Sequence, residues 1–175
     1  MPVKLKRLEL ARFTAFEEAT FDFASGVNVL IGENGTGKSH VLKLIYCLHE
    51  SIRRHVTGTG TEPVARASNL DEILADMLVS VFQPDELHRL VRRGIGRRKT
   101  TIRAVWSEQD REAHLELTLS SLGSLEVVGS SLPSLQRSIF IPTRVIAIGR
   151  AVSRNSLLRG MRQSACQCLV RPQMR

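Results

Sequence analysis

Apolar and polar residues alternate along the first part of the chain, in the pattern typical of half-buried β-strands. The alternation is clear from Leu8 onward within residues 5–13, and residues 17–23 form a second candidate strand. A third run, 27–31, is rich in Val, Leu and Ile, which is typical of a buried strand. Gly26 marks the turn into this run. The chain therefore opens with three predicted strands.

The spacing of apolar residues then changes to that of helices. Apolar residues recur at helical intervals from about 38 to 54, which predicts a first helix. A Gly- and Thr-rich linker follows, and Ser68 or Asn69 is expected to cap a second helix over 70–82. Pro84 is expected at the first position of a third helix, which two later glycines end.

From residue 99 onward the period returns to two. Residues 99–107, 112–121 and 124–130 read as three strands joined by short connections, which predicts an antiparallel meander. Trp106 alternates with other apolar strand residues and is expected in the core. Residues 138–142 are a last short strand candidate, and no helix face can be recognised after them.

Charge separates the last part of the chain from the rest. The net charge is +8, and residues 144–175 hold seven arginines with no Lys, Asp or Glu. Since seven of the 25 basic residues lie there, residues 1–143 hold 18 basic residues against all 17 acidic ones. We therefore predict one domain over 1–143 and a basic irregular tail over 144–175. Such a tail can bind nucleic acid or anionic lipid, and its composition also fits translation in another frame of GC-rich DNA.

Composition narrows the class of protein. No apolar run approaches the roughly 20 residues of a membrane span, and the first residues lack the apolar core of a signal peptide. Three cysteines are too few for a disulfide framework, and neither they nor the five histidines have metal-ligand spacing. The sequence predicts a cytoplasmic protein with reduced thiols and no membrane contact.

A phosphate-binding motif separates the third strand from the first helix. It fits the pattern G-x-x-x-x-G-K-[ST] and consists of Gly32, Glu33, Asn34, Gly35, Thr36, Gly37, Lys38 and Ser39. The N–H groups of such a loop converge on an anion at a helix N-terminus. Lys38 adds a cation for the outer phosphates, and the Ser39 hydroxyl is placed to bind Mg²⁺. The motif predicts binding of a purine nucleoside triphosphate, and the lack of an N-K-x-D-like guanine reader favours ATP.

The stretch from 5 to 45 resembles the N-terminal half of ABC-type AAA-family ATPases. This group includes the overcoming-lysogenization-defect ATPases and is akin to the RecF and structural-maintenance-of-chromosomes heads. The residues that match are Leu8, Phe13, Phe16, Phe21, Gly26, Asn28 and the phosphate loop. The segments 81–94 and 140–144 are also similar, so the resemblance covers about residues 3–144. His40 departs from the family's usual Thr.

The resemblance implies an α/β fold: the N-terminal lobe of an ABC-type P-loop NTPase, with an antiparallel β meander and a helical insert. It implies that ATP lies between two protomers, so that a homodimer forms through the nucleotide face. Arg12 and Phe13 would then lie close to the nucleotide base. A DNA or nuclease partner is a further expectation from this group.

The motifs that such enzymes need for hydrolysis are not found. A Walker B site requires an apolar run ending in Asp and then Glu, and neither Asp71-Glu72, Asp76 nor Asp110 has this setting. No segment resembles the Leu-Ser-Gly-Gly signature. In family members these parts follow the 140–144 segment, so we expect the C-terminal lobe to be absent, the chain to be truncated and no catalytic residue to be present. Strand 27–31 would then lack neighbours, which favours aggregation.

Three functions remain open at this point. They are an ATP-binding module of an ABC-type ATPase without hydrolysis of its own, a non-catalytic regulatory fragment, and a basic nucleic-acid-binding protein; a small-molecule P-loop kinase is a weaker alternative. The basic cluster Arg92, Arg93, Arg97, Arg98 and Lys99 could contact nucleic acid. The simpler interpretation is a solvated loop whose charge is balanced by the nearby acids Asp85 and Glu86.

Overall fold

The structure is a computed structural model that describes residues 3–58, 69–108, 111–136 and 138–139. The chain divides into two units, Met1–Phe140 and Ile141–Arg175, and every described residue lies in the first. The basic tail and most of the predicted linker lie outside the described residues. The domain boundary at 143 therefore stays a prediction.

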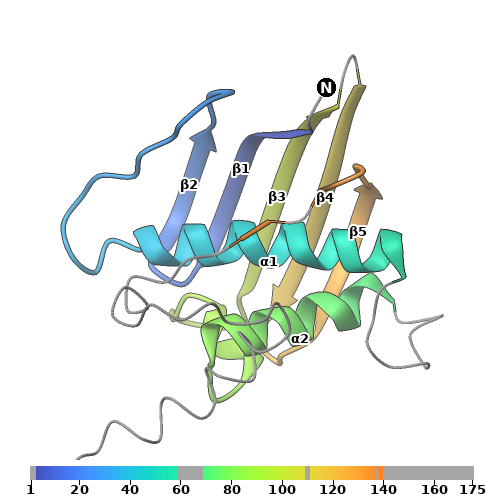
Figure 1. Ribbon diagram of the computed structural model, residues 1–175. Coiled ribbons are helices and arrows are strands. Elements are labelled where there is room, and N and C mark those ends of the chain that lie inside the picture. The colour runs from blue at the N-terminus through green and yellow to red at the C-terminus, as the bar shows by residue number, and fades with distance from the viewer. Residues whose placement is uncertain (1–2, 59–68, 109–110, 137, 140–175) are drawn as a thin grey trace, which may run out of the picture. The chain divides into compact units, whose positions relative to one another are not determined.

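The described strands form one antiparallel sheet, in the order β2-β1-β3-β4-β5 (Figure 1). The strands are β1 (Lys4–Phe13), β2 (Phe16–Asp22), β3 (Lys99–Glu108), β4 (Arg111–Ser120) and β5 (Leu125–Ser131). The first two predicted strands and the predicted meander are confirmed, and β1 and β2 pair as an antiparallel hairpin. β1 pairs with β3, for example Leu8 with Ala104, so two segments distant in sequence share one sheet.

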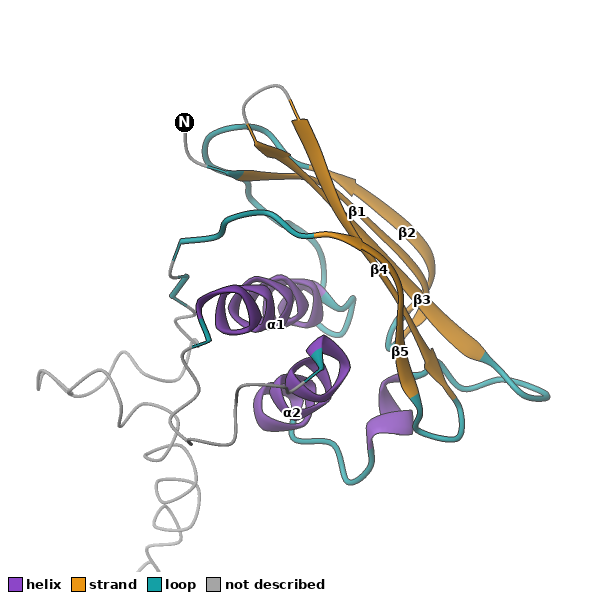
Figure 2. Cartoon of the chain, turned by 90° about the vertical axis from the view of Figure 1, so that its right-hand side faces the viewer, coloured by secondary structure: helices purple, strands orange, loops and turns teal. Residues whose placement is uncertain are grey.

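Two helices cover the same face of this sheet (Figure 2). They are α1 (Lys38–Thr57) and α2 (Leu70–Phe82), and both were predicted from the periodicity. The strands bury alternate residues, such as Ile102, Ala104 and Trp106 on β3, because successive side chains of a strand point to opposite faces. The core therefore lies between the helices and one face of the sheet. Among the described residues, no helix has both the length and the apolar character needed to cross a membrane.

Trp106 connects the sheet to α1 through a buried polar contact. Its side chain is fully buried, and its indole Nε1 donates a hydrogen bond of 2.9 Å to Nε2 of His49. Burial lowers the pKa of His49 from its ordinary value of 6.5. His49 must therefore stay neutral to accept this hydrogen bond, and its role is in the core.

We expect this contact to make the folded chain sensitive to acid. Because the folded-state pKa of His49 is lowered, the unfolded chain takes up the proton first as the pH falls below about 6.5. The free energy of unfolding therefore decreases as the pH falls, by at most about 1.4 kcal/mol per pH unit for one group. Burial also lowers the pKa of His40, which contributes in the same direction. Urea unfolding of the full chain at pH 7.5 and pH 5.0 measures the effect.

The variant His49→Gln keeps a hydrogen-bond acceptor and removes the titration. We expect it to show a smaller loss of stability between the two pH values than the unsubstituted chain. His114→Gln, at an exposed position of β4, is the matched control and should leave the loss unchanged. Equal losses in all three proteins would show that the pH dependence arises elsewhere.

The predicted strand over 27–31 is wrong. This segment is a loop between β2 and α1, and Val27, Val29 and Ile31 are 89%, 72% and 91% exposed (Figure 1). A strand is stabilised by hydrogen bonds to its neighbours, and none of the described strands pairs with this segment. The side chain of Asn28 instead organises a turn: it accepts from the Ala24 N–H at 2.8 Å and donates to the Ala24 carbonyl at 3.0 Å.

The predicted helix from Pro84 is also wrong. Only a short 3₁₀ helix, η1 (Leu87–Leu90), forms there. The residues after η1 pair with the end of β1 instead of continuing a helix. Val91 forms a β-bridge with Phe13, and the Arg92 N–H donates to the Arg12 carbonyl at 2.8 Å. Of the predicted strand 138–142, residues 138 and 139 are not in a strand, and the rest lies outside the described residues.

Candidate nucleotide-binding site

The phosphate loop ends at the N-terminus of α1, as the motif predicts. Gly35 and Gly37 have φ values of 85° and 92°, in the left-handed region that favours glycine. The Gly37 carbonyl accepts hydrogen bonds from the N–H groups of His40 and Val41, at 2.9 and 3.1 Å. The first turn of α1 therefore begins directly after the loop, and the orphan N–H groups of a helix N-terminus face the same region.

The Lys38 ammonium lies against the loop that precedes it. Its Nζ donates to the carbonyls of Gly32 and Glu33, at 2.7 and 2.5 Å, and lies 3.5 Å from the Thr36 hydroxyl. That hydroxyl in turn donates to the Glu33 carbonyl at 2.9 Å. The two carbonyls thus hold the Lys38 ammonium beside the loop. Phosphate oxygens of a bound ligand can replace the carbonyls as acceptors of its hydrogen bonds. Ser39 is exposed in the first turn of α1.

The loop is supported from below by the turn between β1 and β2. A Cβ atom on Gly37 would lie 2.7 Å from the Phe16 ring and 3.2 Å from the Ala15 Cβ. Real Cβ atoms do not approach an aromatic ring so closely, so the chain requires glycine here for space as well as for its φ angle. The position of the phosphate loop is therefore set by the N-terminal hairpin.

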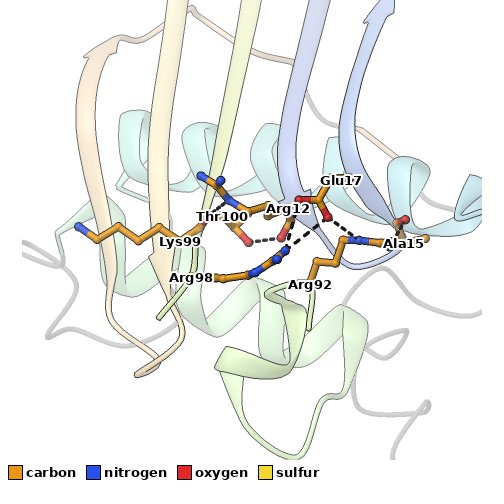
Figure 3. Close-up of polar contacts among 7 residues, drawn as sticks. All are labelled: Arg12, Ala15, Glu17, Arg92, Arg98, Lys99 and Thr100. Atoms are coloured by element: carbon orange, nitrogen blue, oxygen red, sulfur yellow. Dashed lines mark hydrogen bonds and ion pairs between the residues drawn. The ribbon is translucent and has the colours of Figure 1, made fainter. Parts of the chain in front are cut away.

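Two residues expected near a nucleotide base have different surroundings. The Phe13 side chain is fully buried, and its ring packs edge-on against Phe82 at a centroid distance of 5.8 Å. This ring has no exposed face for a base, so its role is in the core. Arg12 is half-buried with a φ of 55°, and its Nε donates to the Lys99 carbonyl at 2.8 Å (Figure 3). Its contact with a nucleotide stays a prediction.

The acidic residues weighed as Walker B candidates are not grouped around the loop. Asp71 lies in the first turn of α2, and its carboxylate accepts from the Val127 N–H at 3.1 Å, which connects α2 to β5. Glu72 and Asp76 are exposed on the same helix, and Asp110 lies outside the described residues. In the described part of the chain, no three His, Cys, Asp or Glu side chains are close enough to hold a metal ion.

Sequence reasoning missed the partner of the basic cluster. Glu17, on β2, accepts from Arg92 Nε at 2.9 Å and from Arg98 Nη1 at 3.3 Å, so its carboxylate lies between the two guanidinium groups (Figure 3). Glu86 pairs with His88 instead, at 2.8 Å. The expected charge balance with Asp85 and Glu86 is therefore wrong for these arginines. Only pairing of strands distant in sequence brings Glu17 to the cluster, so no local signal could have found it.

Together, these features define a class of protein. A glycine-rich loop with an inward lysine precedes a helix that packs on an antiparallel sheet with a helical insert. This is the arrangement of a P-loop domain of the AAA type.

The chain belongs to the AAA domain family, which matches residues 7–126. It is similar to proteins named "DNA replication and repair protein RecF" from several bacteria. The identity is 48% over 44 residues for Limosilactobacillus fermentum, or 25% of this chain and 12% of the relative. It is 33% over 76 residues for Acidothermus cellulolyticus, or 43% of this chain and 20% of the relative. The chain thus spans at most a fifth of the length of these two relatives.

Among solved structures, the chain is similar to one described as the recombination mediator protein RecF with ATP, in the RecFOR pathway. The TM-score is 0.46 at 20% sequence identity, and the match covers 76% of this chain and 29% of the other.

Proposed function

We propose that this chain binds ATP through its phosphate loop, as the nucleotide-binding lobe of an ABC-type ATPase. The observation that carries the proposal is the Lys38 ammonium held against the loop, directly before the N-terminus of α1. A triphosphate would replace the carbonyls of Gly32 and Glu33 as partners of this ammonium. The loop N–H groups and the helix dipole would stabilise the same charge.

Mg²⁺ is part of the same proposal. The exposed Ser39 hydroxyl on the first turn of α1 would be its protein ligand. Mg²⁺ usually keeps several waters and takes phosphate oxygens as further ligands, so one protein oxygen is enough for binding. The donor set therefore fits Mg²⁺ that arrives with the nucleotide, rather than a resident ion.

The proposal is tested by replacing Lys38 with alanine. Charge-assisted hydrogen bonds contribute about 1.5–3 kcal/mol each, so we expect Lys38→Ala to bind Mg²⁺-ATP about tenfold more weakly, or worse. Isothermal titration calorimetry on the full chain measures the affinity. Lys4→Ala, at an exposed position at the start of β1, is the matched loss of charge and should bind as the unsubstituted chain does. Equal affinities of the two variants would contradict the proposal.

Hydrolysis by this chain alone is expected to be negligible. Phosphoryl transfer requires a carboxylate beside Mg²⁺ and a group that positions the attacking water. Asp71 is engaged with Val127, and in the described part of the chain no three His, Cys, Asp or Glu side chains are close enough to hold a metal ion. A phosphate-release assay on the full chain should show no turnover above the Lys38→Ala variant. Turnover clearly above that variant would show that the required carboxylate is present.

Its setting in the cell is also a proposal. We infer a cytoplasmic protein that forms a homodimer through its nucleotide face and acts with DNA or a nuclease; a role with DNA is supported by the similarity to DNA replication and repair proteins. The arginines of residues 144–175 favour a second function, non-specific binding of nucleic acid by the tail. Salt-dependent DNA binding that is lost on deleting 144–175 and is independent of nucleotide would support this second function over the first.

A further inference from the structure

A cavity of about 170 Å³ lies apart from the phosphate loop, beside the end of β1. Four of the nine described residues that line it are arginines: Arg89, Arg92, Arg93 and Arg98. Ser121, in the turn between β4 and β5, contributes a hydroxyl-bearing side chain to the lining. We call these five residues the arginine pocket. None of the described residues that line it is acidic.

The backbone around the arginine pocket is tied to the sheet. The Thr14 N–H donates to the Leu90 carbonyl at 2.9 Å, and the Ser121 N–H donates to the Arg98 carbonyl at 3.0 Å. Gly94 lies directly under the Arg98 guanidinium, which occupies the space that a Cβ on residue 94 would need. These contacts position the arginines, so the pocket is a built feature of the fold and more than a chance group of surface side chains.

Positive charge in the pocket exceeds the negative charge available to it. Arg92 and Arg98 share the single carboxylate of Glu17, which approaches from β2 and whose side chain is 57% exposed. Arg89 and Arg93 have no acidic partner among the described residues. Exposed ion pairs contribute little to stability, so an incoming anion can compete with Glu17 at low cost. Convergent guanidinium groups are the side chains best suited to bind phosphate oxygens.

We propose that the arginine pocket is a second anion site, which binds one phosphate group. Its size favours a phosphate group over an enclosed whole nucleotide. A volume of about 170 Å³ is well below the roughly 300 Å³ at which pockets for drug-sized ligands start. A single phosphate group fits, with the remainder of the ligand outside. The group is supplied either by a nucleic-acid backbone or by a small phosphate compound.

The test uses the full chain with Lys38→Ala in the background, which silences the phosphate loop. The probes are inorganic pyrophosphate, by calorimetry, and a fluorescent single-stranded DNA 20-mer, by anisotropy. Arg93→Gln and Arg98→Gln should each weaken binding of at least one probe about tenfold. Arg103→Gln removes the same charge at an exposed position of β3, away from the pocket, and should have no comparable effect. The tail is identical in all variants and cannot produce a difference between them.

Glu17→Gln should change the binding affinity in the opposite direction. It removes the carboxylate that competes for Arg92 and Arg98, so we expect it to strengthen binding of the same probe several-fold. Weakening confined to DNA identifies the source as a nucleic-acid backbone, and weakening confined to pyrophosphate identifies a small phosphate compound. If Arg93→Gln and Arg98→Gln match Arg103→Gln with both probes, and Glu17→Gln has no effect, the proposal is overturned. Failure of ATP binding at the phosphate loop would not affect this result.

Discussion

Trp106→Ala should lower the free energy of unfolding by about 3–5 kcal/mol, the range observed when large aromatic residues are removed from protein cores. The side chain is fully buried on β3 beneath the helices, so its removal leaves a cavity that the sheet cannot fill. It also leaves His49 without the donor of its 2.9 Å hydrogen bond. Since domains of this size are stable by about 5–15 kcal/mol, the variant should be close to unfolding.

Urea unfolding followed by far-UV circular dichroism measures this change, because Trp106 is the only tryptophan and its fluorescence is lost in the variant. Trp106→Phe is the matched control: it keeps an aromatic ring and loses the indole N–H. We expect it to retain most of the stability, with a remaining deficit of about 1–3 kcal/mol from the unpaired His49 and the smaller ring. A loss under 1 kcal/mol in Trp106→Ala would contradict the central place of this side chain in the core.

Gly37→Ala should both destabilise the chain and disturb the phosphate loop. A φ of 92° costs a non-glycine residue about 1–2 kcal/mol, and forcing a Cβ to within 2.7 Å of the Phe16 ring adds about 1–3 kcal/mol of overpacking. We expect a total loss of about 2–5 kcal/mol. Because Gly37 precedes the first residue of α1, a shift that relieves this contact would move the loop, and affinity for Mg²⁺-ATP should fall as well.

Substitutions at two other glycines separate the cost of the positive φ from the cost of the contact with Phe16. Gly35→Ala adds a methyl group at a φ of 85° with nothing within 4 Å, so it isolates the conformational strain. Gly26→Ala adds it in open space without a positive φ and should change little. Urea unfolding should therefore rank the losses Gly37→Ala above Gly35→Ala above Gly26→Ala. If Gly37→Ala and Gly35→Ala lose the same stability, the contact with Phe16 is not a constraint.

Local pattern was sufficient for most elements of the described part. Period-two alternation identified β1, β3, β4 and β5, and helical spacing identified α1 and α2, because each element buries one face against a common core. The same rule failed for 27–31, where a strongly apolar run stays exposed as a loop. An apolar run indicates a strand only when partner strands are present to accept its backbone hydrogen bonds, and those partners are not visible in the run itself.

For the site, the sequence by itself determined the chemistry of the phosphate loop, since the glycines, Lys38 and Ser39 lie within eight consecutive residues. Only the tertiary structure decided what surrounds it. Pairing of β1 with β2 and β3 sends Phe13 into the core, places Phe16 beneath Gly37 and brings Glu17 between two arginines about 80 residues away. Such contacts depend on which strands become neighbours, and that choice is made by the burial of the whole core rather than by any local stretch.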